Sequence, residues 1–267
     1  MNVETGAGIR ARLRAVAAGP GPEEGRGGGL RLAGGPVLAA GRVHEACGPG
    51  RRSLALWLAA GGTGGGTAGG TGAVIWIHPG WLPERPYPDG FCATLAPGRL
   101  ILVAGRRPVD LLWAAEEALR AGAAGLVVAD LPAPPGLTPV RRLHLAAEAG
   151  CAARGRGATT GLILTPGEGG AAGVESRWHL APRHGAAGSA WRLERRRART
   201  DPPAAWTVTR PGDGLGAGPS PCPAPDHAPP DHAQPDHATG LVLRPAGPQD
   251  ANGTFAGRRE DAAATPP

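Results

Sequence analysis

Residues 43–53 decide the fold: Val-His-Glu-Ala-Cys-Gly-Pro-Gly-Arg-Arg-Ser runs from an extended segment through two glycines into a helix pattern. A strand, a glycine-rich loop and a helix in this order are the context of a phosphate-binding loop. The full motif ends in Lys followed by Ser or Thr; here the loop is about two residues short, and Arg52-Ser53 stand at its end. The sequence therefore predicts the shape of a nucleotide loop without its usual chemistry.

The missing lysine is a property of the whole chain, because all 28 basic residues are arginine. A lysine ammonium is compact and reaches the β- and γ-phosphates of a nucleotide, whereas the guanidinium of Arg52 is a wider planar fork. Three interpretations of the loop stay open: nucleotide hydrolysis, weak binding of a nucleotide or phosphate, and a purely structural turn, which we favour. The residues that would bind phosphate are Gly48, Gly50, Arg52 and Ser53.

Asp130 is the second candidate for a nucleotide site, because it ends a short apolar run. An aspartate at the carboxyl end of such a strand holds Mg²⁺ through water in nucleotide hydrolases. The alternative is a turn cap before Pro132, which we favour without the lysine. We therefore expect no cofactor, with ATP and Mg²⁺ as the open alternative.

The middle of the chain alternates between strand and helix patterns. Helix patterns cover 53–60, 108–122, with Pro108 at the start and Gly122 at the end, and 138–150, with Thr138 as N-cap. Short continuous apolar runs are typical of strands buried on both faces of a parallel sheet. Four such runs occur, at Ala73–Ile77, Leu100–Ala104, Gly125–Ala129 and Gly161–Thr165. The alternation predicts a three-layer α/β domain with a mostly parallel sheet, followed by a terminal hairpin or edge strands at Trp191–Leu193 and Trp206–Thr209.

Composition divides the chain into three parts. Gly and Pro number 46 and 30 of the 267 residues, which is typical of partly disordered chains, yet 41% of the residues are hydrophobic. Residues 1–35 are a low-complexity segment, residues 36–210 are the predicted α/β domain, and residues 211–267 are a Pro-, Ala- and Asp-rich tail. We expect disorder in both end segments and in a Gly-rich insertion at 61–72, because they lack apolar surface to offset the entropy of ordering.

A basic run lies between Trp191 and Trp206 and consists of Arg195, Arg196, Arg197 and Arg199. Arginines beside indole rings could grip a phosphate backbone while bases stack, which makes these residues candidates for single-stranded DNA binding. The favoured alternative is an ordinary strand with cation–π contacts. Among the remaining tryptophans, we expect Trp57, Trp76 and Trp81 in the core or a lid, and Trp113 in the core because of its helical spacing.

Other features limit the possible function classes. The four cysteines are widely spaced without a Cys-x-x-Cys pair, so neither a zinc ribbon nor a redox motif is predicted. His227, His232 and His237 lie in Pro-Asp-His-Ala units without an established ligand spacing, and no metal is expected. His44 with Glu45 could be an acid–base pair, but structural polar contacts are favoured. No apolar run could span a membrane and no secretory core region follows the start, so we expect a soluble cytoplasmic protein.

An ordered series of sequence blocks resembles the ImuA family, RecA-like accessory proteins of the bacterial damage-induced mutagenesis cassette. The resemblance spans residues 36–210 and is most specific around Trp113 and Arg141. The blocks are 41–45, Trp76-Ile77, 97–103, 110–120, 127–131, 141–148 and 175–178.

The resemblance implies a RecA-like fold of the phosphate-loop type that has lost ATP turnover. RecA carries a catalytic glutamate after the strand corresponding to Ala73–Ile77, whereas His78-Pro79 follow here. It also implies a role in translesion DNA synthesis, with an ImuB-type polymerase-like protein and an error-prone replicative-type polymerase as partners. Two alternatives stay open: an ATP-dependent recombinase-like protein that binds DNA, and an interaction protein of the cell-division-inhibitor type.

Overall fold

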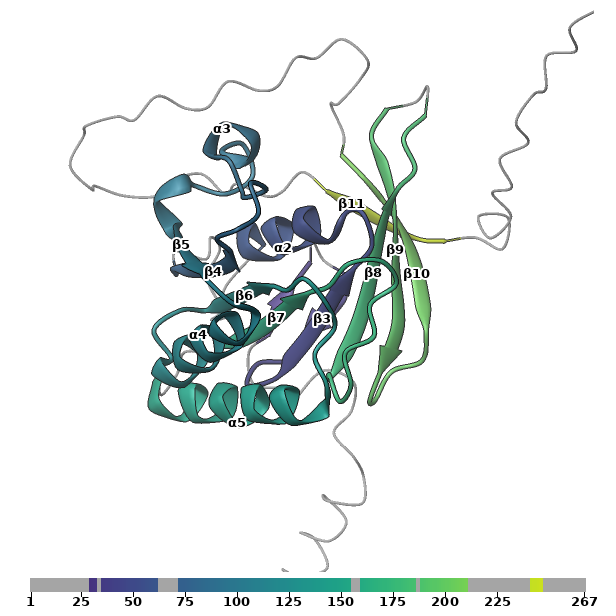
Figure 1. Ribbon diagram of the computed structural model, residues 1–267. Helices are drawn as coiled ribbons and strands as arrows, with labels where there is room; N and C mark the ends of the chain where they lie inside the picture. Colours follow the sequence, from purple (N-terminus) through teal and green to yellow (C-terminus); the bar gives the residue numbers. More distant parts are fainter. Residues whose placement is uncertain are drawn as a thin grey trace, which may run out of the picture.

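The protein is described by a computed structural model that covers residues 29–32, 35–61, 72–154, 159–185, 188–210 and 241–246. Within these residues, nine strands form one sheet in the order β11-β10-β9-β8-β3-β7-β6-β4-β5, and β1 and β2 form a separate pair (Figure 1). Five of the strand pairings, from β8 to β5, are parallel, and the three beyond β8 are antiparallel. The expectation of an α/β fold with a mostly parallel sheet is confirmed.

The parallel part contains the four strands predicted from apolar runs, together with the strand before the glycine loop. β3, β6 and β7 are buried along their whole length, because neighbouring strands and both outer layers cover them. The strands are β3 (Val43–Cys47), β4 (Val74–Pro79), β5 (Leu100–Gly105), β6 (Leu126–Asp130), β7 (Thr160–Leu164) and β8 (Ser176–Pro182).

Layers of helix and loop cover both faces of this sheet. On one face, α2 (Arg51–Ala60) packs through Trp57 and Leu58 in a core that includes Trp76 and Trp178. The short segments α3 (Pro88–Phe91) and η1 (Pro97–Arg99) lie in the crossover from β4 to β5. On the other face, α4 (Pro108–Ala121) and α5 (Leu137–Arg154) form a second core with Val127 and Ile163 (Figure 1).

The two helices of the second face approach each other closely. A side chain at Gly150 would place its Cβ 1.9 Å from the carbonyl oxygen of Leu119, and one at Gly122 would lie 2.5 Å from the carbonyl oxygen of Gly150. Gly122 ends α4 in the left-handed conformation at φ 62°, as predicted. The prediction that Gly150 ends α5 was wrong, because this glycine is needed inside the helix for the close approach to α4.

The antiparallel part extends the sheet beyond β8. β9 (Ala190–Ala198) pairs with β8 and, as an antiparallel hairpin, with β10 (Ala204–Thr209), so the hairpin alternative predicted around Trp191 and Trp206 is confirmed. The edge-strand alternative was wrong, because β8 and β11 flank the two strands. The rings of Trp57 and Trp191 meet edge to face at 4.9 Å between centroids. This part is therefore attached to the α2 layer by aromatic packing as well as by the strand ladder.

Short strands also occur inside the end segments expected to be disordered. β1 (Leu30–Arg31) pairs with β2 (Val37–Leu38), and β11 (Val242–Pro245) pairs with β10. Leu30 is 1% exposed, and Leu241 and Leu243 contact the same core as α2. A few apolar residues are enough here because the sheet and core already exist and each added strand has a partner ladder. The rest of both end segments and the insertion at 62–71 lie outside the described residues.

The core prediction is confirmed for Trp57 and Trp76 and is wrong for Trp113, whereas Trp81, expected in the core or a lid, lies outside the core. Trp57 and Trp76 are buried in the core, whereas Trp81 is 44% exposed in the segment after β4 and Trp113 is 62% exposed on α4. Leu111, Ala115 and Leu119 form the buried stripe of α4 instead. Trp113 satisfies the helical spacing but lies on the outer side of the helix, beside the exposed Val109.

The sheet ends at β5, whose outer edge has no partner strand within the described part of the chain. No helix in the described ranges has both the length and the apolar character needed to cross a membrane.

Candidate functional site

The glycine loop follows the carboxyl end of β3, at the point where the order of strands reverses. Strands β4 to β7 lie on one side of β3, and β8 to β11 lie on the other. In open α/β sheets, ligands bind outside the carboxyl ends of the strands at such a switch point. The loop therefore occupies the position where a binding site is expected from topology.

The backbone amides of the loop already have partners. The Gly48 N–H donates to the carbonyl oxygen of Gly167 at 2.8 Å, and the Gly50 N–H donates to that of Leu180 at 2.9 Å. Gly48 has φ +84°, and a Cβ there would lie 2.6 Å from the Leu180 oxygen, so only glycine fits this turn. Two donors that would face a phosphate in a nucleotide loop are used to close the turn against β8 and the loop after β7.

Arg52 and Asp130 are brought together directly. Arg52 Nε donates to Asp130 Oδ2 at 2.6 Å, from the first turn of α2 to the end of β6, across β7. The Asp130 side chain is 4% exposed, and a buried carboxylate of this kind requires a partner. The residue at the lysine position of the motif therefore neutralises the acid at the Mg²⁺ position.

Ser53 and the His78-Pro79 pair are the two other positions that the sequence analysis compared with nucleotide hydrolases. Ser53 lies in the first turn of α2 and is partly buried. His78 and Pro79 end β4 beside β6, since Ile77 pairs with Ala129. His78 is 6% exposed, and its Nδ1 lies 3.2 Å from the carbonyl oxygen of Pro79. The structure thus places Ser53 in the first turn of α2 and His78 at the end of β4, beside the strand that carries Asp130.

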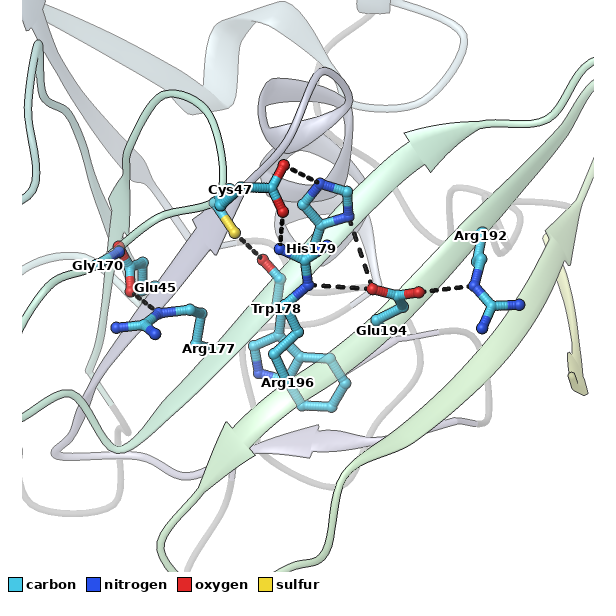
Figure 2. A network of polar contacts seen from close by, with 10 residues as sticks. Glu45, Cys47, Gly170, Arg177, Trp178, His179, Arg192, Glu194 and Arg196 are labelled. Atoms are coloured by element: carbon cyan, nitrogen blue, oxygen red, sulfur yellow. Dashed lines mark hydrogen bonds and ion pairs between the residues drawn. The ribbon is translucent and has the colours of Figure 1, made fainter. Parts of the chain in front are cut away.

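Sequence reasoning did not identify the polar network at the end of β3 (Figure 2). Glu45 is fully buried, and Arg177 Nε donates to its Oε2. Its Oε1 accepts hydrogen bonds from Thr165 Oγ1 at 2.7 Å and from the amides of Gly170 and Ala171 at 2.9 and 3.0 Å. Glu45 thereby holds the ends of β3, β7 and β8 and the loop between β7 and β8 together.

His44 points to the opposite face of the sheet from Glu45, as adjacent strand residues do. Its Nδ1 lies 2.7 Å from Ser176 Oγ and its Nε2 lies 3.0 Å from the carbonyl oxygen of Ala39. Burial lowers the pKa of His44 to about 4. His44 and Glu45 therefore have separate structural partners, in agreement with the favoured interpretation. His44, Ser176 and Trp178 also line a cavity of about 120 Å³.

Cys47 ends β3 next to this network and is held there as a buried thiol. Its Sγ–H donates to the carbonyl oxygen of Trp178 at 3.3 Å, and the side chain is buried. Burial, followed by the charge of Glu45, raises the pKa of the Cys47 thiol to about 11. The thiolate that nucleophilic chemistry requires is therefore strongly disfavoured near neutral pH.

The exposed end of the network surrounds His179 on β8. Glu168 Oε1 lies 3.8 Å from His179 Nε2, and Glu168 also forms an ion pair with Arg196. Glu194 accepts from Arg196 Nε at 3.0 Å and from Arg192 Nε at 2.7 Å (Figure 2). Burial lowers the pKa of His179, with Arg196 adding to the effect, whereas the hydrogen bond from Arg196 lowers the pKa of Glu168.

The basic run does not form one surface. Arg195 packs over the rings of Trp178 and Trp206 at 5.7 and 5.6 Å and bonds to Asp201. Arg196 faces the other side of the sheet, where it pairs with Glu168 and Glu194. Arg197 is exposed on β9. Arg199 follows the strand with its Nε 3.6 Å from Glu175. Arg195 and Arg196 are therefore held on opposite faces of the sheet, next to a register shift in the β8–β9 ladder that interrupts the regular alternation.

Metal ligands do not gather in the described part of the chain, where no group of three or more His, Cys, Asp or Glu side chains is arranged to hold an ion. The Pro-Asp-His-Ala units with His227, His232 and His237 lie outside the described residues.

Comparison with known proteins finds similar folds among the solved structures. No protein-family model matches the chain, and no curated protein matches it. The structure is similar to the crystal structure of SulA from Pseudomonas aeruginosa, with a TM-score of 0.36 and 19% sequence identity. The match covers 47% of this chain and 98% of the SulA chain. A resemblance at this level carries no argument about function.

Proposed function

We propose that the protein is a non-catalytic RecA-like adaptor in DNA-damage-induced translesion synthesis. In this proposal it acts with an ImuB-type polymerase-like protein and an error-prone replicative-type polymerase. The observation that carries the non-catalytic part is the ion pair of Arg52 with Asp130 at 2.6 Å. The adaptor role itself rests on the sequence blocks that resemble the ImuA family.

Nucleotide turnover would need the loop amides and the Asp130 carboxylate, and in this protein both already have partners within the chain. Binding phosphates requires free amides in the loop, and binding Mg²⁺ requires a carboxylate that is free for water or metal. The Gly48 and Gly50 amides bond to Gly167 and Leu180, and the Asp130 carboxylate bonds to Arg52. His78-Pro79 end β4 at the place that corresponds to the catalytic glutamate of RecA. Each of these contacts favours a binding protein over an ATPase.

The strand order supports the RecA-like part of the proposal. β7 lies between β3, which leads into the loop, and β6, which ends in Asp130. The loop and the acid are therefore separated by one strand, and a side chain from the first turn of α2 can reach across it, as Arg52 does.

The exposed side of α4 is the surface that we assign to a partner. Trp113 is 62% exposed and Val109 is 60% exposed, on a helix whose buried stripe is complete without them. Exposed tryptophans are frequent energetic centres of protein interfaces. This tryptophan also lies in the block 110–120, where the resemblance to the ImuA family is most specific.

Two measurements test the proposal. Purified full-length protein should show no ATP turnover above that of an Asp130→Asn variant, with or without single-stranded DNA. Tagged protein should co-purify the polymerase-like protein encoded by the same organism. A Trp113→Ser variant should reduce this recovery, and a Leu145→Ser variant, which changes an equally exposed residue on α5, should not. Robust turnover that is lost in Asp130→Asn would refute the non-catalytic role. Recovery of the division tubulin without a polymerase partner would support the cell-division-inhibitor alternative instead.

A further inference from the structure

A cavity of about 120 Å³ lies near the amino ends of β3 and β8, at the opposite end of the sheet from the glycine loop. Val37 and Ala39 line it from the segment around β2, and Ser176 and Trp178 line it from β8. None of its lining residues belongs to the glycine loop, so this cavity is separate from the nucleotide site that the sequence suggested.

A chain of hydrogen bonds in the wall of the cavity leaves Ser176 as an acceptor. His44 Nε2 lies 3.0 Å from the carbonyl oxygen of Ala39, which can only accept, so Nε2 carries the proton. Burial lowers the pKa of His44 to about 4, so the ring is neutral near pH 7 and Nδ1 accepts. Ser176 therefore donates its hydroxyl proton to Nδ1 at 2.7 Å, and its Oγ accepts from Trp178 Nε1 at 2.6 Å. One lone pair of Ser176 Oγ is left for a ligand that donates a proton.

Arg195 adds proton donors to the lining of the same cavity. Its side chain is 14% exposed and lies over the rings of Trp178 and Trp206. Nε donates to the carbonyl oxygen of Pro202 at 3.0 Å, and Nη1 donates to Asp201 Oδ2 at 3.3 Å. Within the described residues, Nη2 has no hydrogen bond, although a guanidinium offers five N–H donors. Arg195 therefore retains donors for a ligand that accepts.

The charge and the size of the cavity restrict the ligand further. Arg195 lines it together with the acidic residues Glu175 and Asp201, so a ligand with a net charge of either sign meets a like charge, whereas a neutral ligand does not. An engineered cavity of roughly 150 Å³ binds benzene, so a volume of about 120 Å³ suits a single six-membered ring. Substituents on such a ring can extend past Asp201, whose side chain is 36% exposed.

We propose that this cavity binds a neutral six-membered ring that contains an imide, the group in which one N–H lies between two carbonyls. The imide N–H donates to the lone pair of Ser176 Oγ, and a carbonyl oxygen accepts from the guanidinium of Arg195. Uracil and thymine rings carry this group. A ring without the N–H would bury the Ser176 acceptor unpaired, which costs free energy, so the cavity should select for the donor. The site is independent of the adaptor role and of the Arg52–Asp130 pair.

The test compares ring probes of similar size on the full chain. Titrations would follow the indole N–H signal of Trp178 by NMR, assigned through a Trp178→Phe variant. 1-Methyluracil should bind at least about fivefold more tightly than 1-methylcytosine, which has an acceptor nitrogen in place of the imide N–H. 1,3-Dimethyluracil, which lacks that proton, should bind as weakly as 1-methylcytosine. Equal affinities for 1-methyluracil and 1-methylcytosine, or no response to 1-methyluracil, would overturn the proposal.

Two arginine variants separate the cavity from a general change in charge. Arg195→Met removes the donors and should weaken binding of 1-methyluracil at least about fivefold. Arg197→Met changes an exposed arginine of the same strand that does not line the cavity, and it should leave binding unchanged. An equal effect of both variants, or no effect of Arg195→Met, would contradict the proposal. The comparison of ring probes needs no variant, so it decides the question even if Arg195→Met does not fold.

An oligothymidylate strand separates the two sources of such a ring, a free base and an unstacked base of a single strand. Tighter binding of the strand than of 1-methyluracil would identify a strand as the source, and weaker or equal binding would identify the free ring. Either result supports the site only if the binding is weakened in Arg195→Met and not in Arg197→Met. ATP turnover and co-purification are separate readouts, so this test does not depend on the adaptor role.

Discussion

Glu45 and Glu168 lie at opposite ends of the polar network shown in Figure 2, and they differ in burial and in the kind of partner that each carboxylate has. Glu45 is fully buried and accepts four hydrogen bonds, two of them from backbone amides. Glu168 is 76% exposed, and its partners within the described ranges are the side chains of Arg196 and His179. Breaking a buried, fully bonded ion pair costs much more than breaking an exposed one, which water can replace. The buried end of the network therefore fixes the fold, whereas the exposed end can exchange partners.

The largest expected effect is at the buried end. Glu45→Gln removes the charge that pairs with Arg177 and turns an amide group toward donors, so we expect the free energy of unfolding to fall by about 3–5 kcal/mol. Urea denaturation measures this quantity. Glu148→Gln is the control on an exposed pair and should change stability by less than about 1 kcal/mol. Similar stabilities of the two variants would contradict the distinction between the two ends.

The second largest expected effect is a loss of folding stability in acid, caused by buried histidines. The pKa of His44 is lowered from 6.5 to about 4, so the unfolded chain takes up a proton in this range while the folded protein does not. Stability is complete above pH 6.5 and is lost as the pH falls, by about 2 kcal/mol from His44 alone at about pH 5. His144 and His179, whose pKa values are also lowered chiefly by burial, act in the same direction.

Urea denaturation at about pH 7 and about pH 5 checks the histidine effect. A His44→Gln variant should lose less stability between these two conditions than the unchanged protein. The lowered pKa values of Glu168 and Glu194 act in a lower pH range, below the ordinary value of 4.5. If both proteins lost the same amount, the titration of His44 would not be the cause.

The Arg52–Asp130 pair should have an intermediate effect, since the aspartate is buried and the arginine is partly exposed. Arg52→Gln leaves the Asp130 carboxylate without its charged partner, and we expect a loss of about 1–3 kcal/mol in the free energy of unfolding. The double variant with Asp130→Asn should lose less than the sum of the single variants. The exposed Arg141 on α5 is a control, and Arg141→Gln should stay within about 0.5 kcal/mol. Additive single and double variants would show that the pair is not coupled.

The smallest expected effect is at the exposed end. Glu168→Gln should leave the free energy of unfolding nearly unchanged, because exposed ion pairs contribute little. The same urea measurement applies. A loss as large as that of Glu45→Gln would mean that the loop after β7 is a fixed part of the fold.

The sequence predicted the parts of the fold that depend on local patterns. Apolar runs located β4 to β7, and Pro108 and Gly122 located α4 correctly. Contacts between distant elements could not be predicted. A glycine such as Gly150 is typical of the end of a helix, and only the close approach of α4 explains why it lies inside α5. Trp113 fits a buried spacing, but which side of a helix meets the sheet depends on the neighbouring elements.

The candidate site could be predicted only in part. The glycine loop and Asp130 were visible because motif spacing is local, and their meeting through Arg52 was not. Glu45 was noticed only as a neighbour of His44, since nothing near it in the sequence indicates that Thr165, Gly170 and Arg177 would converge on it. The contacts of Glu168 could not be predicted either, because the glycines around it indicate only a loop.

The crossing of α4 and α5 has a consequence for how this sequence can change over evolutionary time. Glycine occurs at 46 positions, and a composition so biased would suggest that most of them are interchangeable. Gly90, Gly98 and Gly136 meet nothing within 4 Å of an added Cβ, so mutational drift can replace them freely. At Gly150 an added Cβ would meet the Leu119 carbonyl oxygen at 1.9 Å. Purifying selection should therefore act on this codon and leave those three to follow the base composition of the genome.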